Sequence, residues 1–562
     1  MVKEKDKDLL PIHRFTGHQY SRLLNLRRGT IPRLIAVATF IVILYLLFGP
    51  TRDQSATQPP FPSSERNDTV DLSWNERLNW RRGQEEEIIS RRSIYSPEMF
   101  QPKALKTNGL KPVTVVLLGW KRQEGLKTVV QYLAKYPYFK EILIWNNNKQ
   151  ARLNVKDFEL NSTNAAHLEI RVFNSDENLH DLSKYTTCSM ARYDHCYFQD
   201  DDWLNLYLDS IYTNFLRYPN LIHSNTMPII HLEHRRWQFT NPAIDMHTGF
   251  TWLGCGAFIP RSKVLRFLAQ LGSNGLSKDR LRVADMYFSI WTNQYPYQMS
   301  NPLTPLDQKE GWSDGVDQWR IVYQNIYDAS SKLYEALAAN AVDHFMREEE
   351  QPRPDQRDTR APCLNDKCLF LTNIDPFPLP TSVVFDNVNV TQVRMQETQF
   401  DKLDFPSNDF WTKHAYHYAV DRDDNTCWNS YKAPHAGDYF GLHMLTAINS
   451  KHVTILSSQN INHLENVFAI STSTNGDRWV GFSPLYIYFP KIARLARTDS
   501  MNHVTCKYQP LKDAVVSSDP HRLHIGFLCP AAEPFRFLRI EFQRDLPEPF
   551  EVCSLGLEGF NV

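Results

Sequence analysis

Three consecutive carboxylates, Asp200, Asp201 and Asp202, are the residues of this sequence whose spacing points most directly to chemistry. They follow the run Tyr197-Phe198-Gln199, so they would stand where a buried strand ends. Hard divalent cations bind several oxygen ligands, and such a cation neutralises the charge on a departing diphosphate. The triplet therefore indicates a metal site, although acidic runs of this kind also occur in solvated loops.

A parallel α/β sheet is the predicted support of this triplet. Apolar runs at residues 113–118, 141–145 and 168–173 are typical of buried strands, and residues 123–136 have the periodicity of an amphipathic helix. Strands that alternate with helices favour a parallel sheet, in which ligands bind beyond the carboxyl ends of the strands. We therefore expect the residues that follow these strands to lie beside the triplet.

Length and composition limit the number of domains and the class of protein. A chain of 562 residues is too long for one core, so two or three domains are expected. The content of 42% apolar and 22% charged residues is ordinary for a globular protein. The 62 Lys and Arg residues nearly balance the 63 Asp and Glu residues, which gives no electrostatic argument for nucleic-acid binding.

A series of short segments keeps one order between residues 112 and 335. The segments are Val113–Leu118, Trp120-Lys121-Arg122, Ile142–Asn147, Asp200–Asp202, Leu253–Phe258, Val283–Phe288, Gly311-Trp312-Ser313 and Asn325–Asp328. In this order they resemble the C-terminal glycosyltransferase domain of the exostosin family, glycosyltransferase family 64. The resemblance implies an α/β GT-A domain, a Rossmann-like nucleotide-diphospho-sugar transferase fold, over residues 111–345.

The same resemblance implies roles for the acidic triplet and for an arginine. Asp202 would ligate the metal, as the third Asp of the family's triplet does. Asp200 and Asp201 would contact the ribose or support the site. Arg122 would reach the nucleotide phosphates or the base, because a guanidinium forks onto phosphate oxygens. The alternative for Arg122 is a surface arginine after a strand.

Further polar residues are assigned to the nucleotide by their matched positions. Asn146 or Asn147 would hydrogen-bond the base, and the alternative is a turn pair that caps the strand. Lys184 stands where the family carries an arginine near the nucleotide, and a lysine there keeps the charge but loses the bidentate fork. Asn178 lies nearby in the sequence and is assigned to the nucleotide as well.

Asp285 matches the acid of the family's catalytic site, where it would orient the acceptor hydroxyl or the donor sugar. This chain departs from the family at Ala284, where a second acid is usual, and the departure puts the donor or acceptor identity in doubt. The family retains the anomeric configuration. Such enzymes are described by front-face attack, in which the leaving phosphate helps to take the acceptor proton.

The resemblance thus predicts a metal-dependent retaining glycosyltransferase of the secretory pathway. It would use Mn2+ or Mg2+ and a nucleotide sugar, with a UDP-sugar favoured and a GDP-sugar as the alternative. The transferred hexose or N-acetylhexosamine would go to a glycan, glycoprotein or glycolipid. A second hypothesis is a membrane-anchored carbohydrate-binding protein with a degenerate transferase site, which Ala284 and Lys184 keep open.

The N-terminal part predicts a type II membrane protein. Residues 34–48 form an uninterrupted apolar run preceded by many Lys and Arg residues, so the positive-inside rule places residues 1–32 in the cytosol. We predict a transmembrane signal anchor over residues 33–50 and a polar stem over residues 51–110. Everything after the anchor would lie in the lumen of the Golgi or endoplasmic reticulum. A cleaved signal peptide is less favoured, because the charged region before the apolar run is long.

The nine cysteines all follow this predicted anchor, and no C-x-x-C pair occurs among them. In an oxidising lumen several can form disulfides, with at least one left unpaired. Spacing does not fix the connectivity; Cys188 with Cys196 and Cys363 with Cys368 are the pairs suggested by proximity. The N-glycosylation sequons begin at Asn67, Asn161 and Asn389.

The C-terminal part differs from the first domain in its composition and in its hydrophobic pattern. Residues 348–362 contain Ala361 as their one apolar residue, and we predict a linker over residues 346–380. Short alternating segments separated by turn clusters then predict an all-β jelly-roll or galactose-binding-like sandwich over residues 381–562.

Four segments of this part resemble the discoidin, or coagulation factor C-type, module. They are Ala419–Ser430, Gly437–Leu442, Phe468–Trp479 and Phe537–Phe542. Such modules bind glycans or lipid surfaces, or serve as scaffolds, and both hypotheses stay open. Trp428 and Trp479 are predicted core residues. The turn Asp421–Asn425 would either hold a calcium ion or be a capped turn.

Overall fold

The computed structural model describes residues 110–160, 166–306, 318–339, 357–386, 397–450, 452–476, 479–482, 519–526, 534–558 and 560. The predicted cytosolic tail, membrane anchor and stem (apart from Leu110) lie outside these residues, as do the three sequons. Within the described part of the chain, no helix combines the length and the apolar character needed to cross a membrane. All described residues belong to one compact unit, Thr69–Val562.

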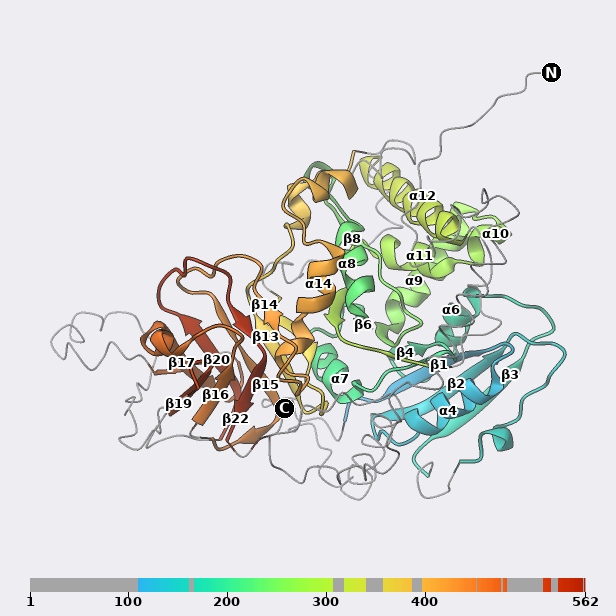
Figure 1. Cartoon of the computed structure of the whole chain (residues 1–562). Helices are drawn as coiled ribbons and strands as arrows, with labels where there is room; N and C mark the ends of the chain where they lie inside the picture. The colour runs from blue at the N-terminus through green and yellow to red at the C-terminus, as the bar shows by residue number, and fades with distance from the viewer. Residues whose placement is uncertain are drawn as a thin grey trace, which may run out of the picture. The chain divides into compact units, whose positions relative to one another are not determined.

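The first region is built on a seven-stranded sheet of order β10-β6-β9-β4-β1-β2-β3 (Figure 1). Its strands are β1 (Val113–Gly119), β2 (Phe139–Asn146), β3 (Glu169–Asn174), β4 (His195–Gln199), β6 (His223–Thr226), β9 (Ala257–Pro260) and β10 (Tyr297–Ser300). The neighbours are parallel except at β9, which runs antiparallel to β4 and β6. The chain enters β9 from a loop at the carboxyl end of β4, where Gly254 O accepts from Asp200 N at 2.7 Å, so β9 must run back. The predicted parallel sheet is corrected at this strand.

Helices cover both faces of this sheet (Figure 1). The helices of this region are α4 (Gln123–Leu133), α6 (Leu182–Ser189), α7 (Leu208–Arg217), α8 (Pro228–Arg236), α9 (Arg261–Asn274), α10 (Lys278–Leu281), α11 (Ala284–Trp291) and α12 (Gln318–Ala338), of which the short α10 has no buried residue. Val115 and Leu117 of β1 pack in one core with α4 and α7, while Val116 packs in a second core with α6, α9, α11 and α12. This alternation along one strand explains why its sequence is apolar throughout.

Short antiparallel pairs complete this region. They are β5 (Trp203–Leu204) with β11 (Thr304–Pro305), and β7 (Gln238–Asn241) with β8 (Met246–Gly249). The β5–β11 pair matters for the site, because β5 begins directly after the acidic triplet.

The second region is a β-sandwich. A six-stranded sheet of order β12-β13-β15-β20-β17-β18 shares one core with a three-stranded sheet, β19-β16-β22. The strands are β12 (Thr359–Pro362), β13 (Cys368–Thr372), β15 (Tyr439–Ile448), β16 (His452–Leu456), β17 (Phe468–Ser473), β18 (Val480–Phe482), β19 (Arg522–Gly526), β20 (Phe535–Phe542) and β22 (Ser554–Leu557). A small pair, β14 (Trp428–Asn429) with β21 (Glu551–Val552), and helix α14 (Asn408–His414) accompany them. The prediction of an α/β region followed by an all-β sandwich is confirmed.

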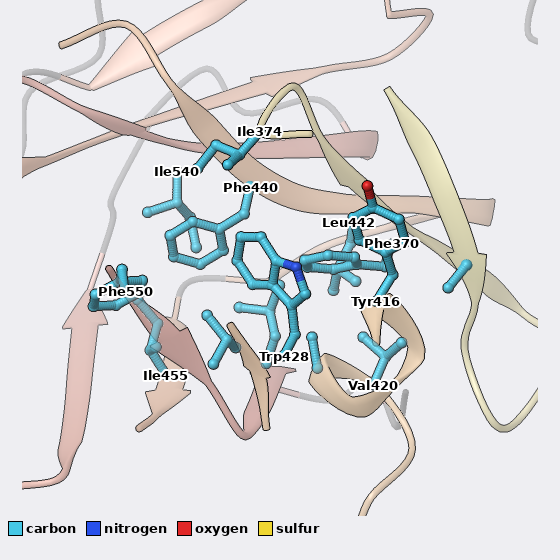
Figure 2. Packing of buried hydrophobic residues seen from close by; sticks show 14 of the residues in the cluster. Phe370, Ile374, Tyr416, Val420, Trp428, Phe440, Leu442, Ile455, Ile540 and Phe550 are labelled. Carbon is cyan, nitrogen blue, oxygen red and sulfur yellow. The ribbon is translucent and has the colours of Figure 1, made fainter. Parts of the chain in front are cut away.

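The two tryptophans that were predicted to be core residues differ. Trp428 is fully buried and lies between Phe370 and Phe440, within a cluster that Figure 2 shows from close by. Trp479 is only half-buried, and the Arg539 guanidinium lies 3.9 Å from the centroid of its ring. The prediction is confirmed for Trp428 and wrong for Trp479, which packs on the outside of the sheet against a cation.

The predicted linker over residues 346–380 is wrong for its described part, residues 357–380. This part contains β12 and β13 of the six-stranded sheet. Its charged residues are buried with partners: the Arg357 guanidinium donates to the carbonyl oxygens of Tyr295 and Pro296, each at 2.8 Å, and Arg360 pairs with Asp375 at 3.2 Å. The polar composition therefore reflects buried charged residues that bond other parts of the chain, not solvent exposure.

The loop between β12 and β13 joins the sandwich to the first region. Helix α7 has no side-chain cap from its own flank, and Asp366 instead accepts from the backbone N–H groups of Asp209 and Ser210, both at 2.9 Å. Lys367 Nζ lies 2.6 Å from the Asp209 carboxylate. Leu369 of β13 packs in the same core as α4 and α7. The sandwich thus supplies the N-terminal cap of a helix that begins shortly after the acidic triplet.

The disulfides confirm both pairs suggested by proximity, Cys188–Cys196 and Cys363–Cys368. A third, Cys427–Cys553, joins cysteines 126 positions apart, for which spacing gives no signal. Cys255 is the cysteine without a disulfide within the described ranges, while Cys506 and Cys529 lie outside them.

Candidate functional site

The acidic triplet forms the turn between β4 and β5, at the strand end where the sequence predicts it. The backbone fixes this turn from two sides, because Asp200 N donates to Gly254 O and Leu306 N donates to Asp202 O at 2.8 Å. Gly254 and Gly125 lie against the triplet, and the absence of a Cβ in glycine allows this close contact. A Cβ at Gly254 would collide with the Asp200 carboxylate, and a Cβ at Gly125 with the Asp201 carbonyl oxygen. The three carboxylates are therefore held at defined places at the edge of the sheet.

Arg122 reaches this turn from the end of β1, where it precedes helix α4. Its Nε donates to Asp201 Oδ1 at 2.9 Å, and its Nη1 donates to Asp202 Oδ2 at 2.9 Å. The guanidinium thus bridges two of the three acids, which also suits it to fork onto phosphate oxygens at this edge. The structure brings Arg122 to the triplet as predicted and does not leave it as an isolated surface arginine.

Lys184 and Asp285 approach the triplet from the other side. Lys184, on α6, places Nζ at 2.8 Å from Asp285 Oδ2 and 3.2 Å from Asp200 Oδ1. Asp181, the residue before α6, lies 3.5 Å from the same ammonium. Asp285, in the first turn of α11, also accepts from the Tyr185 hydroxyl at 2.7 Å. Residues separated by about a hundred positions therefore meet in one cluster, and both predicted residues belong to it.

Electrostatics in this cluster favour a further cation. Its five carboxylates face two cationic side chains, Arg122 and Lys184. Burial, only partly offset by Arg122, raises the pKa of Asp201 to about 7; for Asp202, burial and the neighbouring Asp200 raise the pKa to about 6. Raised carboxyl pKa values mean that negative charge is costly here, so a ligand that brings positive charge would be stabilised.

The three predicted asparagines serve the backbone around the cluster. The Asn146 amide donates to Ala151 O at 2.6 Å and accepts from Asn148 N at 3.0 Å, so it caps the end of β2. Asn147 accepts from Leu179 N and donates to the Ser183 hydroxyl, which fixes the segment that leads into α6. Asn178 accepts from His180 N at 2.8 Å. For Asn146 and Asn147 the capping alternative describes the contacts found.

Carboxylate oxygens are the ligands that this cluster offers to Mn2+ or Mg2+. Over the residues described, no group of three or more His, Cys, Asp or Glu side chains is arranged to hold a metal ion. Mg2+ in nucleotide sites is commonly held by one or two carboxylates together with substrate phosphates. The nearby Asp200 raises the electrostatic cost of ionising Asp202, and carboxylates suit Mg2+ and Mn2+. The residues present fit an ion of this kind.

Two residues of the cluster were missed in the sequence. Asp181 stands three positions before Lys184, a spacing that could have suggested a helical ion pair. Burial and the nearby Asp285 raise the pKa of Asp181 to about 8. Tyr185 is adjacent to Lys184, but nothing local indicates that its hydroxyl meets Asp285 a hundred positions later. Ala284, beside Asp285, is fully buried in an apolar core.

Comparisons with known proteins give matches among solved structures. No protein-family model and no curated protein matches the chain. The mannosyltransferase PcManGT from Pyrobaculum calidifontis, in complex with GDP-Man and Mn2+, is 13% identical over 47% of this chain and 75% of that chain, with a TM-score of 0.27. TarS 1–349 from S. aureus, in complex with UDP-GlcNAc, is 12% identical over 42% of this chain and 72% of that chain, with a TM-score of 0.26.

A further solved structure matches at 10% identity. It is CpGH89CBM32-5 from Clostridium perfringens, in complex with GalNAc-β-1,3-galactose, and the match covers 26% of this chain and 83% of that chain with a TM-score of 0.17. These identities and TM-scores are too low to carry an inference about function. Any such inference must depend on the contacts described above.

Proposed function

We propose that this protein is a metal-dependent, retaining glycosyltransferase. It would move a hexose or N-acetylhexosamine from a nucleotide sugar, a UDP-sugar in the first place and a GDP-sugar as the alternative, to a glycan, glycoprotein or glycolipid. The observation that carries the proposal is the convergence of Arg122, Lys184, Asp285 and the acidic triplet at the carboxyl edge of the sheet. That edge is where α/β sheets bind nucleotides, and the sequence resembles the GT-A domain of the exostosin family over the same residues.

Asp202 and its neighbour Asp200 would hold the Mn2+ or Mg2+ ion. When bound, the ion supplies positive charge that neutralises the departing diphosphate. Arg122 would exchange part of its bond with Asp202 for phosphate oxygens, because its fork is already directed at the triplet. Asp201, almost wholly buried and bonded to Arg122, would keep that guanidinium at the site.

A lumenal location in the Golgi or endoplasmic reticulum, behind a type II anchor, is part of the same proposal. The disulfides of the described residues support it, because disulfides persist in oxidising compartments. Protease treatment of sealed microsomes from cells that express the protein tests this lumenal location. We expect protection of the catalytic part until detergent is added.

A donor panel tests the activity. The purified protein would be incubated with UDP- and GDP-sugars, with and without Mn2+, and the release of nucleoside diphosphate measured. We expect release from one class of donor only when the ion is present, and its loss in Asp202→Ala. Asp423→Ala is the matched control, since Asp423 belongs to a second acidic turn whose carboxylate bonds within the turn.

Two outcomes would contradict this proposal. Full activity in Asp202→Ala would contradict the metal assignment. No hydrolysis of any donor, together with no heat of binding for nucleotide plus Mn2+, would favour the carbohydrate-binding protein with a degenerate site.

A further inference from the structure

Asp285 is the predicted catalytic acid, yet both of its oxygens already have buried partners. Oδ1 accepts from the Tyr185 hydroxyl at 2.7 Å, and Oδ2 accepts from Lys184 Nζ at 2.8 Å. The side chain is only 3% exposed. A carboxylate that attacks a sugar, or takes a proton from an acceptor, must present an oxygen to that atom. Each carboxylate oxygen can accept more than one hydrogen bond, but at 3% exposure a substrate atom has almost no access to either oxygen of Asp285.

Lys184 is as fully occupied as Asp285. An ammonium has three N–H donors, and three carboxylates surround this one, Asp285 at 2.8 Å, Asp200 at 3.2 Å and Asp181 at 3.5 Å. Its side chain is 4% exposed. Lys184 therefore contacts Asp200, and its burial leaves the ammonium almost inaccessible to a substrate.

Exposure separates the cluster into two layers. Asp200 at 33% and Asp202 at 18% are the triplet residues that a ligand can reach, and Arg122 at 16% lies beside them. Lys184 and Asp285 form the layer below, joined to the upper layer through the contact between Lys184 and Asp200. Lys184 also contacts Asp181, which is 29% exposed, so Lys184 is the residue through which Asp285 meets the exposed carboxylates.

We infer that Asp285 is a positioning residue that acts through Lys184, and that it does not touch the sugar or the acceptor. This inference rests on the proposed transferase function. Asp285 and Tyr185 fix the Lys184 ammonium, and the ammonium fixes the Asp200 carboxylate beside Asp202. Asp285 then forms no covalent bond to the sugar, so retention does not proceed through a glycosyl–Asp285 intermediate. This role does not require a second acid at position 284, because one carboxylate, that of Asp285, is enough to position Lys184.

A double-mutant cycle tests the inference with Lys184→Met, Asp285→Asn and the double variant, using the donor identified in the panel. Removing a supporting partner commonly costs about 10- to 100-fold in activity or metal affinity. We expect each single variant to lose that much in kcat and to need more Mn2+ for half activity. The double variant should be no worse than Lys184→Met, because Asp285 then has nothing to position. Losses that multiply in the double variant would overturn the inference, since Asp285 would then act independently of Lys184.

Glu141→Gln is the matched control. Glu141 is also a buried carboxylate held by a hydroxyl, from Thr114 at 2.7 Å, and by a cation, Arg171 at 2.5 Å. It lies near the start of β2, while the site lies beyond the carboxyl ends of the strands. We expect Glu141→Gln to lower the unfolding midpoint and to leave kcat and the Mn2+ requirement of the folded enzyme unchanged. An equal change in the Mn2+ requirement would mean that any buried acid of the sheet has this effect, and would overturn the specific role of Asp285.

Failure of the proposed function is distinguishable from failure of this inference. A wild-type protein that turns over no nucleotide sugar contradicts the proposed function. The same four proteins then decide the inference by their urea-unfolding midpoints. Non-additive shifts support Lys184 and Asp285 as one unit, and additive shifts overturn it.

Discussion

Two acid-rich turns of this molecule have similar compositions and different structures. The triplet Asp200–Asp202 is bonded by side chains from distant elements, with Arg122 79 positions before Asp201 and Lys184 bonded to an acid 101 positions later. The turn Asp421–Asn425 mostly closes on itself, since Asp421 accepts from Asp423 N and Asp423 accepts from Asn425 N. Most partners of the triplet carboxylates are far away in the sequence, whereas the second turn has mainly local partners and one distant ion pair, between Asp424 and Arg522.

Burial alone does not separate the two turns. It raises the pKa of Asp421 to about 7, as it does for Asp201. The difference lies in what the oxygens bond. Asp421 uses its oxygens on a backbone amide and on the Thr426 hydroxyl, which are the donors of a capped turn. The capped turn is thus the hypothesis that these contacts favour over calcium. At the triplet the partners are cations. A metal ion can take the place of a cation beside these carboxylates, and a diphosphate can take the place of a carboxylate beside Arg122.

The largest expected effect comes from removing the cation that bridges the triplet. Arg122→Met should lower kcat/KM for the donor by about 10²- to 10³-fold, the usual loss when a donor to developing charge is removed. Donor kinetics at saturating Mn2+ measure it. Arg522→Met is the matched control, because Arg522 pairs with Asp424 of the second turn at 3.4 Å. An equal loss of kcat/KM in Arg122→Met and Arg522→Met would contradict the proposal that the triplet, and not the second turn, binds the donor.

Asp366 extends the comparison to a third acid that reaches a distant element. Asp366→Ala leaves the N–H groups of Asp209 and Ser210 without their cap, and loss of an N-cap costs about 0.5–2 kcal/mol. The free energy of unfolding in urea should fall by about that amount. Asp423→Ala, which breaks a bond within its own turn, should cost less. A larger loss for Asp423→Ala would contradict the expectation that a carboxylate bonded to a distant element stabilises the fold more than a carboxylate bonded within its own turn.

The sequence was sufficient for whatever depends on neighbours along the chain. The apolar run at residues 113–118 predicted β1, and the run before the triplet predicted a strand that ends there. The meeting of the triplet with Arg122, 79 positions before Asp201, was predicted from the carboxyl ends of parallel strands and not from neighbours along the chain. The sequence was insufficient for other distant partners. The Tyr185 hydroxyl on Asp285, and the strands hidden in the polar segment after residue 357, depend on partners that no local pattern announces. The cap of α7 by Asp366, 157 positions away from Asp209, has the same cause.

Titration of Asp421 gives a pH test of the second turn. The carboxyl group is protonated in both states well below pH 4. Between about pH 4 and about pH 7 it ionises in the unfolded chain but not in the folded protein, so this group destabilises the fold progressively as the pH rises, and the cost is constant above that range. One pKa unit corresponds to about 1.4 kcal/mol, and because Asp421 is partly exposed we expect about 1–2 kcal/mol in all. Asp421→Asn should remove this part of the pH dependence of the free energy of unfolding, and an unchanged profile would contradict it.

The smallest effect is expected at the ion pair between Asp424 and Arg522, whose side chains are 38% and 26% exposed. Exposed pairs contribute about 0–1 kcal/mol, since water already solvates both charges. Asp424→Asn should therefore change the free energy of unfolding by less than about 0.5 kcal/mol, and raising the salt to about 1 M, where the screening length is about 3 Å, should abolish the difference. The destabilisation caused by Asp285→Asn should survive the same salt, because its pair with Lys184 is almost fully buried. Salt sensitivity at Asp285 would mean that solvent reaches the lower layer of the site, and the contrast between the two turns would then fail.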